Sequence, residues 1–165
     1  DVKGRKIKQN FSVTNEETPR IIDPRNAYIM TSLLQEVINT GTGRKAKRLK
    51  REDIAGKTGT TNELVDAWFA GFNPDIVTVT WMGFDQPRTL GKHESGARAA
   101  LPIWIDYMRP IINEYPTKIL ESPYGIVPLR INPKDGMLAK KGEDGIFEYF
   151  YDEFLPTKNA YFLLN

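Results

Sequence analysis

The fold is decided by residues 54–84, which read IAGKTGTTNELVDAWFAGFNPDIVTVTWMGF. Three stretches rich in β-branched, aromatic and small residues, 54–61, 66–72 and 76–84, are typical of strands. Residues 73–75, Asn-Pro-Asp, are turn formers that join the second stretch to the third. The pattern predicts an antiparallel hairpin and, with the strand before it, a meander of three successive strands.

A helix is predicted over residues 24–40, ahead of this sheet. Asp23 suits the N-cap, and Pro24 suits the first helical position. Apolar residues then recur at one-face helical spacing, at Met30, Leu33, Leu34, Val37 and Ile38. We expect this stripe to pack on a sheet, and we expect Gly41 to end the helix as a left-handed cap.

A second helix is predicted over residues 97–113, after the sheet. Its apolar side carries Ile103, Trp104, Tyr107, Met108 and Ile111. Pro102 is tolerated near the start of a helix, whereas Pro110 should bend or end it.

The two ends of the chain differ in pattern from its middle. Residues 1–22 are polar and turn-rich, and we interpret them as a loop or weak hairpin. Residues 114–165 carry Pro and Gly punctuation between short predicted strands, at 126–131, 137–139 and 146–151. Pro128 marks the first of these as an edge strand. We therefore divide the chain into a main unit, 1–113, and a C-terminal extension, 114–165.

Composition excludes several classes of function. A length of 165 residues suits one main domain, and a net charge of +2 gives no general attraction to nucleic acid. The absence of cysteine excludes disulfides, thiolate zinc sites and cysteine nucleophiles. No apolar run approaches the roughly 20 residues that span a bilayer. The chain begins without a methionine and in mid-pattern, so we expect it to be part of a longer protein that carries any anchor or export signal.

Three further features have ordinary structural interpretations. The basic residues of 44–51 favour a solvated face over binding of an anionic polymer or lipid head group, since no aromatic residues are interleaved. His93 is expected at the surface, without a ligand set around it. Trp68, Trp81 and Trp104 are expected in the core.

Residues 56–61, Gly-Lys-Thr-Gly-Thr-Thr, require a chemical explanation. A phosphate-binding loop would need a glycine where Arg51 stands, and a helix where a strand pattern follows. The favoured alternative is a strand at the border of a cleft, which offers a lysine charge, threonine hydroxyls and a glycine where a ligand approaches. An ordinary polar strand is the remaining interpretation. Strict alternation places Thr58 and Thr60 on one face and Lys57 on the other, so all three serve one cleft only if the strand twists or the lysine stem reaches around its edge.

Residues 55–62 together with 66–72 and 81–85 resemble the transpeptidase domain of class A, bifunctional penicillin-binding proteins. Residues 27–44 look like the helix before the motif strand, and 96–104 look like the closing helix. The resemblance covers nearly the whole chain, including a tail like that of Gram-negative members. It implies an α+β fold, here a partial penicillin-binding transpeptidase domain of β-lactamase-like type, with an antiparallel sheet flanked by helices.

The resemblance also implies residue roles. The family cross-links peptidoglycan through a serine acyl-enzyme, and β-lactams acylate the same serine. Lys57 would act in catalysis and Thr60 would supply half of the oxyanion hole through its backbone N–H. Thr58, Gly59, Thr60 and Thr61 would form the substrate-binding strand, with hydroxyls that hold a carboxylate. No metal or other cofactor is expected.

The nucleophile motif of that family is missing from this chain. The residues three positions after Ser12, Ser32, Ser95 and Ser122 are Asn15, Gln35, Arg98 and Gly125. None makes the Ser-x-x-Lys motif that activates the serine, and in the family that motif lies upstream. The chain alone is therefore predicted to be inactive.

The expected partners follow from the same resemblance. They are the peptidoglycan stem peptide, β-lactams and the upstream part of the same synthase, on the periplasmic side of the bacterial inner membrane, with no nucleic acid. Uncovered apolar surface would favour self-association of the fragment. A non-catalytic module that binds peptidoglycan or a synthase regulator is the alternative, as is a relative of serine β-lactamases, although residues 66–72 and the long tail disfavour the latter.

Overall fold

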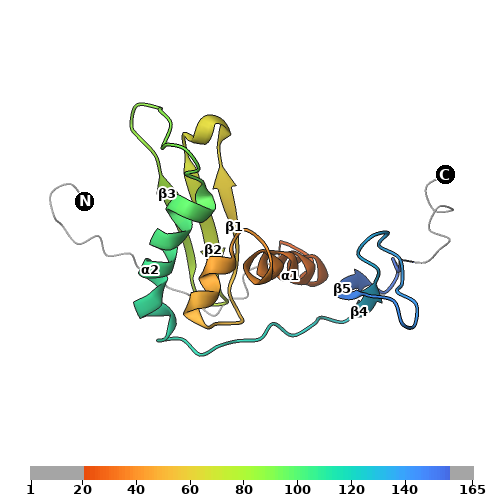
Figure 1. Cartoon of the computed structure of the whole chain (residues 1–165). Coiled ribbons are helices and arrows are strands. Elements are labelled where there is room, and N and C mark those ends of the chain that lie inside the picture. The colour runs from red at the N-terminus through yellow and green to blue at the C-terminus, as the bar shows by residue number, and fades with distance from the viewer. Residues whose placement is uncertain (1–20, 157–165) are drawn as a thin grey trace.

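The computed structural model describes residues 21–156, so most of the loop or hairpin predicted for 1–22 lies outside the described residues (Figure 1). The elements are α1 (Pro24–Asn39), η1 (Arg44–Leu49), β1 (Ala55–Thr60), η2 (Asn62–Leu64), β2 (Ala67–Phe72), β3 (Val77–Met82), η3 (Gly96–Ala100), α2 (Leu101–Ile112), β4 (Ile126–Ile131) and β5 (Ile146–Tyr151). The predicted α+β class, with an antiparallel sheet flanked by helices, is confirmed.

The predicted meander is the main sheet of the structure. Strands β1, β2 and β3 pair antiparallel in the order of the sequence. The side-chain oxygen of Asn73 accepts the backbone N–H groups of Asp75 and Ile76, at 3.1 and 2.8 Å, and so shapes the turn between β2 and β3. This is the local bonding that makes Asn a turn former.

One face of this sheet carries the core, under α2. The rings of Phe69 on β2 and Trp104 on α2 meet edge to face at 5.0 Å, and both side chains are fully buried. The Trp104 indole N–H donates to the Thr78 carbonyl oxygen at 3.1 Å. The prediction of a core tryptophan is confirmed for Trp104, whose buried N–H has found a partner.

The same prediction is wrong for Trp68 and Trp81, which are 42% and 45% exposed. Successive side chains of a strand point to opposite faces, so Trp68 lies on the face away from Phe69. Trp68 and Trp81 pair across β2 and β3, with Val77 and Val79 also exposed on that face. Within the described residues, this apolar face of the sheet is largely uncovered.

Helix α1 begins as predicted, since the Asp23 side chain accepts the Arg25 N–H at 2.8 Å. Its apolar stripe packs only in part: Ile38 belongs to the core, whereas Met30 and Leu33 are half exposed. The stripe is wider than the surface that α1 buries against β1 and β5.

The left-handed cap predicted at Gly41 is wrong, because Gly41 has no positive φ. Thr40 ends the helix, and the Gly41 N–H donates to the Glu36 carbonyl oxygen at 3.2 Å. A Cβ at Gly41 would lie 2.9 Å from the Cα of Val37. Close backbone contact, rather than a special dihedral, therefore requires glycine here.

The second predicted helix is divided into a wide π-helical turn, η3, and the regular helix α2. Pro102 lies in the first turn of α2, and Pro110 lies inside its last turn, just before the helix ends. The buried side differs in part from the predicted one, because Ile103 and Tyr107 are about half exposed. The side chains of α2 that are buried are Leu101, Trp104, Ile105, Met108 and Ile112.

The C-terminal extension runs from α2 to a separate hairpin, β4–β5, which lies beside α1 (Figure 1). The rings of Tyr149 of β5 and Tyr28 of α1 meet edge to face, with their centroids 5.0 Å apart. The Arg25 guanidinium donates to the Glu153 carboxylate at 2.8 Å. The predicted strand over 137–139 is reduced to a single bridge, Leu138 to Ile131. Among residues 21–156, no helix has the length and apolar character needed to cross a membrane.

Candidate active site

The predicted motif residues lie on β1, at the edge of the main sheet. β1 pairs with β2 on one side, and no described strand pairs with its other side. The Thr61 N–H donates to the Asp66 carbonyl oxygen at 3.1 Å, toward the β2 side. Because backbone groups of adjacent residues in a strand point to opposite edges, the N–H and C=O groups of Thr60 and Thr58 are directed toward the open edge.

Lys57 and the two threonines start from opposite faces of β1, as alternation predicts. Thr58 pairs with the buried Phe69, and Lys57 pairs with the exposed Ala70. The Lys57 ammonium donates to the Thr58 carbonyl oxygen at 2.9 Å. The lysine stem thus bends along its own strand to the open edge, and its charge lies next to the backbone of the threonine that follows it.

The Thr58 hydroxyl is held by a residue that the sequence analysis did not single out. The hydroxyl oxygens of Thr58 and Thr42 are 2.7 Å apart. Thr42 belongs to the short turn after α1, where Gly41 and Gly43 approach Val37 closely. The Gly-Thr-Gly sequence could have pointed to Thr42, because two flanking glycines indicate a tight turn that fixes the position of the threonine hydroxyl between them.

The Thr60 hydroxyl is held from the other direction by η3. The Gly96 N–H donates to Thr60 Oγ1 at 3.0 Å. A Cβ at Gly96 would lie 2.4 Å from the Trp68 carbonyl oxygen and 2.5 Å from the Gly59 carbonyl oxygen. Only glycine therefore allows the start of η3 to press on β1 and β2 at this point.

Gly59 and Thr61 complete the predicted substrate-binding strand. A Cβ at Gly59 would lie 3.1 Å from the Cβ of Trp68, on the face away from α2. Thr61 follows the end of β1, and its hydroxyl oxygen accepts the Asp66 N–H at 2.8 Å. This bond closes the connection between β1 and β2, so Thr61 has a structural role. The predicted contact of Thr61 with substrate stays a prediction.

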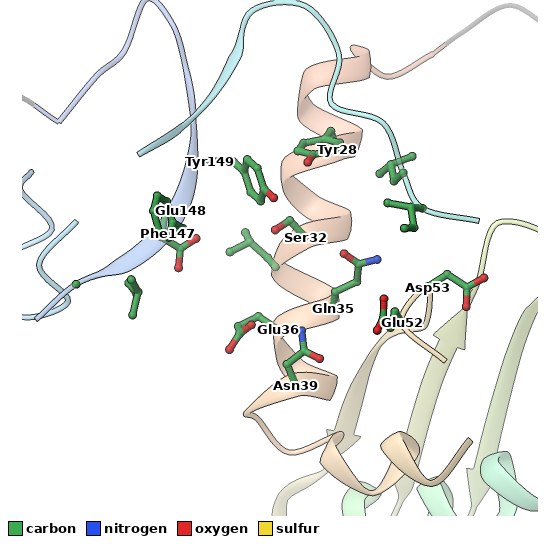
Figure 2. Close-up of a pocket in the computed structure, with 15 residues that line it drawn as sticks. Tyr28, Ser32, Gln35, Glu36, Asn39, Glu52, Asp53, Phe147, Glu148 and Tyr149 are labelled. Carbon is green, nitrogen blue, oxygen red and sulfur yellow. The ribbon is translucent and has the colours of Figure 1, made fainter. Parts of the chain in front are cut away.

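A pocket of about 600 Å³ lies away from the motif strand, between α1 and β5 (Figure 2). Ser32 and Glu36 of α1 and Glu148 of β5 are among its lining residues, together with apolar side chains of the extension. Neither lysine nor histidine lines this pocket, so Ser32 has no basic neighbour of the kind that activates a serine nucleophile. The motif strand carries the better candidate for chemistry.

Within residues 21–156, no group of three or more His, Asp or Glu side chains is arranged so that it could hold a metal ion. His93 is exposed and lies in a loop, where its own φ is positive at 68°.

Comparison with known proteins identifies relatives of this arrangement. Penicillin-binding protein 1A of Pseudomonas aeruginosa is 51% identical over 158 residues, which cover 94% of this chain and 19% of that protein. Penicillin-binding protein 1A of Neisseria gonorrhoeae is 50% identical over 115 residues, which cover 70% of this chain and 14% of that protein. No protein-family model matches the chain. The chain thus spans less than a fifth of the length of these curated relatives.

A solved structure gives the same result for the fold. The crystal structure of penicillin-binding protein 1A from Haemophilus influenzae matches with a TM-score of 0.78 and 38% identity, covering 86% of this chain and 22% of that one. The partial transpeptidase-type fold predicted from the sequence is confirmed by this match.

Proposed function

Because the chain belongs to the class A penicillin-binding proteins, we propose that it forms one wall of the D,D-transpeptidase site of a longer peptidoglycan synthase. In this proposal, residues 1–113 complete the transpeptidase domain and 114–165 extend it. The nucleophilic serine comes from outside this chain, since none of the serines here has a lysine three residues on. The chain alone is inactive.

The observation that carries this proposal is the construction of the open edge of β1. A lysine ammonium lies at that edge, bonded to the Thr58 carbonyl, and the hydroxyls of Thr58 and Thr60 are each fixed by a neighbouring element. Residues fixed by their surroundings lose little freedom on binding a ligand. A polar strand that only faced solvent would need none of these hydrogen bonds.

The reaction assigned to this edge is acyl transfer through a serine ester. The serine attacks the carbonyl of a D-alanyl-D-alanine peptide, the C–N bond to the last residue breaks, and the amine of an acceptor peptide later displaces the serine. Lys57 stabilises charge at the serine's proton-transfer partner and helps to hold the substrate carboxylate. The Thr60 N–H, directed to the open edge, would donate to the oxyanion that forms at the attacked carbonyl.

The substrate class follows from the edge itself. An unpaired strand edge binds an extended peptide as an added strand, with backbone hydrogen bonds supplying affinity. β-Lactams, whose ring carbonyl and carboxylate present similar groups, would occupy the same edge and acylate the same serine. The partners are therefore the peptidoglycan stem peptide, β-lactams and the rest of the synthase, on the periplasmic side of the inner membrane.

The exposed apolar face of the sheet supports a setting inside a larger protein. Trp68, Val77, Val79 and Trp81 together expose an apolar surface of a kind that monomeric soluble proteins seldom leave open. In the proposed synthase, other protein covers it; for the chain alone, it favours self-association.

Intact-mass spectrometry after incubation with a penicillin tests the proposal. The chain alone should gain no adduct, and the longer synthase should gain one adduct on a serine outside this chain. A stoichiometric adduct on Ser32 or another serine of this chain would overturn the assignment of the nucleophile.

A further inference from the structure

The pocket of about 600 Å³ between α1 and β5, which we call the α1–β5 groove, follows one face of α1 (Figure 2). Its lining residues on α1 extend from Tyr28 to Asn39 and recur every three or four positions, which is the spacing of one helix face. At about 1.5 Å per helical residue, this face is roughly 16 Å long and matches an extended peptide of about five residues. The proposed function gives this groove no role.

The opposite wall of the groove is an edge of β5. Residues 145–149 all line the groove, whereas no residue of β4 does. Successive side chains of a strand point to opposite faces, so a groove lined by consecutive residues runs along the edge of the strand. This is the edge away from β4, and no strand within residues 21–156 pairs with β5 there.

The backbone groups of Phe147 and Tyr149 are directed to this open edge. Phe147 is opposite Arg130 of β4, whose carbonyl oxygen accepts the Ala139 N–H at 3.0 Å on the far side of the hairpin. Opposite residues of an antiparallel pair either bond each other or both point away, so Phe147 points away from β4, as does Tyr149 two residues on. Tyr149 is opposite Pro128, which has no N–H to donate. No backbone group in the described part of the chain bonds Phe147 or Tyr149 from the open side.

Exposed apolar side chains surround the same edge. Phe147 is 71% exposed and Ile119 is 80% exposed. Leu33, Leu120 and Ile146 are about half exposed, and all five side chains line the groove. Apolar side chains gathered at an open strand edge are typical of a surface that another chain covers.

The charge of the groove is negative. Glu36, Glu52 and Glu148 line it, and no lysine, arginine or histidine does. None of these three glutamates takes part in the ion pairs formed among residues 21–156, whereas Asp53, which also lines the groove, is paired with Arg51. The carboxylates favour a ligand with basic side chains. They disfavour a second copy of this chain, because pairing of two β5 edges would bring the acidic side chains of two grooves into one interface.

We propose that the α1–β5 groove binds an extended, basic segment of a partner protein, which adds to β5 as the third strand of the β4–β5 sheet. The backbone groups of Phe147 and Tyr149 supply its main-chain hydrogen bonds. Glu148 and Phe147 are successive residues and therefore point to opposite faces, so the matching segment alternates basic and apolar side chains. The groove lies away from the motif strand, so this inference is independent of the proposed function.

The first test uses a fluorescent hexapeptide of alternating lysine and valine, titrated into the full chain and into the longer synthase. Glu36→Gln with Glu148→Gln should raise the Kd on the order of 10-fold or more, because charge-assisted contacts are lost. The matched control is Glu114→Gln with Glu121→Gln, which removes two exposed carboxylates outside the groove and should leave the Kd unchanged. Equal rises in both double variants, or no binding by the parent, would overturn the proposal.

The second test separates backbone from side chain at β5. Phe147→Pro removes the N–H at the open edge without removing a bond to β4, since Phe147 points away from that strand. Phe147→Ala also removes the ring but keeps the N–H. The peptide should bind Phe147→Ala more tightly than Phe147→Pro, on the order of 5-fold, because one main-chain hydrogen bond is lost. Equal affinities would contradict the added strand.

The third test requires no substitution. Hydrogen exchange at the Phe147 and Tyr149 amides, followed by NMR in the full chain and by mass spectrometry in the longer synthase, should slow when the peptide is added. The Glu148 amide, which alternation directs to β4, should change little. Slow exchange at Phe147 and Tyr149 before any peptide is added would overturn the proposal. It would mean that another part of the synthase fills the groove or, if the slowing depends on protein concentration, that a second copy does.

Discussion

The backbone N–H of Gly96 donates to the hydroxyl oxygen of Thr60 at 3.0 Å, joining the start of η3 to the motif strand. Thr60 therefore has two tasks that use different atoms. Its hydroxyl receives a structural bond and can donate to a ligand, and its own N–H is directed to the open edge of the sheet. Substitutions at Thr60 and at Gly96 can separate these tasks.

Thr60→Val removes the hydroxyl and keeps the backbone. Because the partly buried Gly96 N–H loses its partner, we expect the free energy of unfolding to fall by about 1–3 kcal/mol. Acylation in the longer synthase should slow on the order of 10-fold, less than for Lys57→Ala, since the backbone N–H proposed for the oxyanion remains. Chemical denaturation and stopped-flow acylation measure the two effects. Thr60→Ser, which keeps the hydroxyl, should restore both; unchanged stability in Thr60→Val would mean that the bond to Gly96 contributes nothing.

Gly96→Ala tests the close contact between η3 and the strands. The added Cβ would lie 2.4 Å from one backbone carbonyl oxygen and 2.5 Å from another, so η3 must move. We expect a loss of stability of about 1–3 kcal/mol, as for overpacking elsewhere, together with slower acylation. Ser95→Ala is the neighbouring control, because the Ser95 side chain makes no capping bond to η3. A Gly96→Ala protein as stable and reactive as the parent would contradict the contact.

Arg51 and Asp53 form a buried ion pair at 2.6 Å that anchors the end of α2. The Arg51 guanidinium also donates to the carbonyl oxygens of Ile112, Tyr115 and Pro116. Burial alone would raise the pKa of Asp53, but the hydrogen bonds from Arg51 and the Lys118 N–H outweigh it and hold the pKa below its ordinary value. The pair therefore stabilises the fold most where Asp53 is ionised in both folded and unfolded states.

Asp53→Asn should lower the free energy of unfolding by about 3–5 kcal/mol at neutral pH, because Arg51 then keeps a buried charge without its partner. The depressed pKa fixes the sign of the pH dependence. This stabilisation is complete above the unfolded pKa, roughly pH 4, and is lost as the pH falls through the folded value. Denaturation of parent and variant between neutral and acidic pH should show a difference that shrinks only at acidic pH. A difference that stays constant would contradict the assigned role of the carboxylate.

Removal of residues 119–165 from the longer synthase should leave penicillin acylation largely unchanged. The extension contacts α1 through Tyr149 of β5 and through Glu153 just after that strand, whereas the motif threonines are held by Thr42 and Gly96. A labelled β-lactam measures the outcome. A matched cut after Asn113, which also removes two carbonyl partners of Arg51, should reduce stability. Loss of acylation in the first truncation, in a protein that still folds, would mean that the extension shapes the site.

Local patterns in the sequence predicted the elements of this fold well. The turn formers at 73–75 and the N-cap at Asp23 act through bonds between close neighbours, so their geometry follows from the residues themselves. The same holds for the strand character of residues 54–61. These features need no knowledge of the rest of the molecule.

Contacts between distant segments could not be predicted in this way. Trp68 has the composition of a core residue, yet its exposure depends on what covers the second face of the sheet. The partners Thr42 and Gly96, 16 and 36 residues from the threonines they hold, become neighbours only after α1 and η3 have packed. The Arg51 bonds to the end of α2 likewise span more than 60 residues. Sequence showed the motif, and packing determines which groups surround it.

The central claim is that the open edge of β1 is one wall of a transpeptidase site, and Lys57→Ala tests it most directly. Lys57 is exposed and its ammonium bonds only to the neighbouring backbone among described groups, so its loss should leave the melting temperature of the longer synthase nearly unchanged. The measurement is the second-order rate constant for acylation by a labelled penicillin. It should fall to the background level in Lys57→Ala and stay near the parent value in the control Lys47→Ala, which changes an exposed lysine of η1. Acylation by Lys57→Ala at a rate close to that of the parent would contradict the claim.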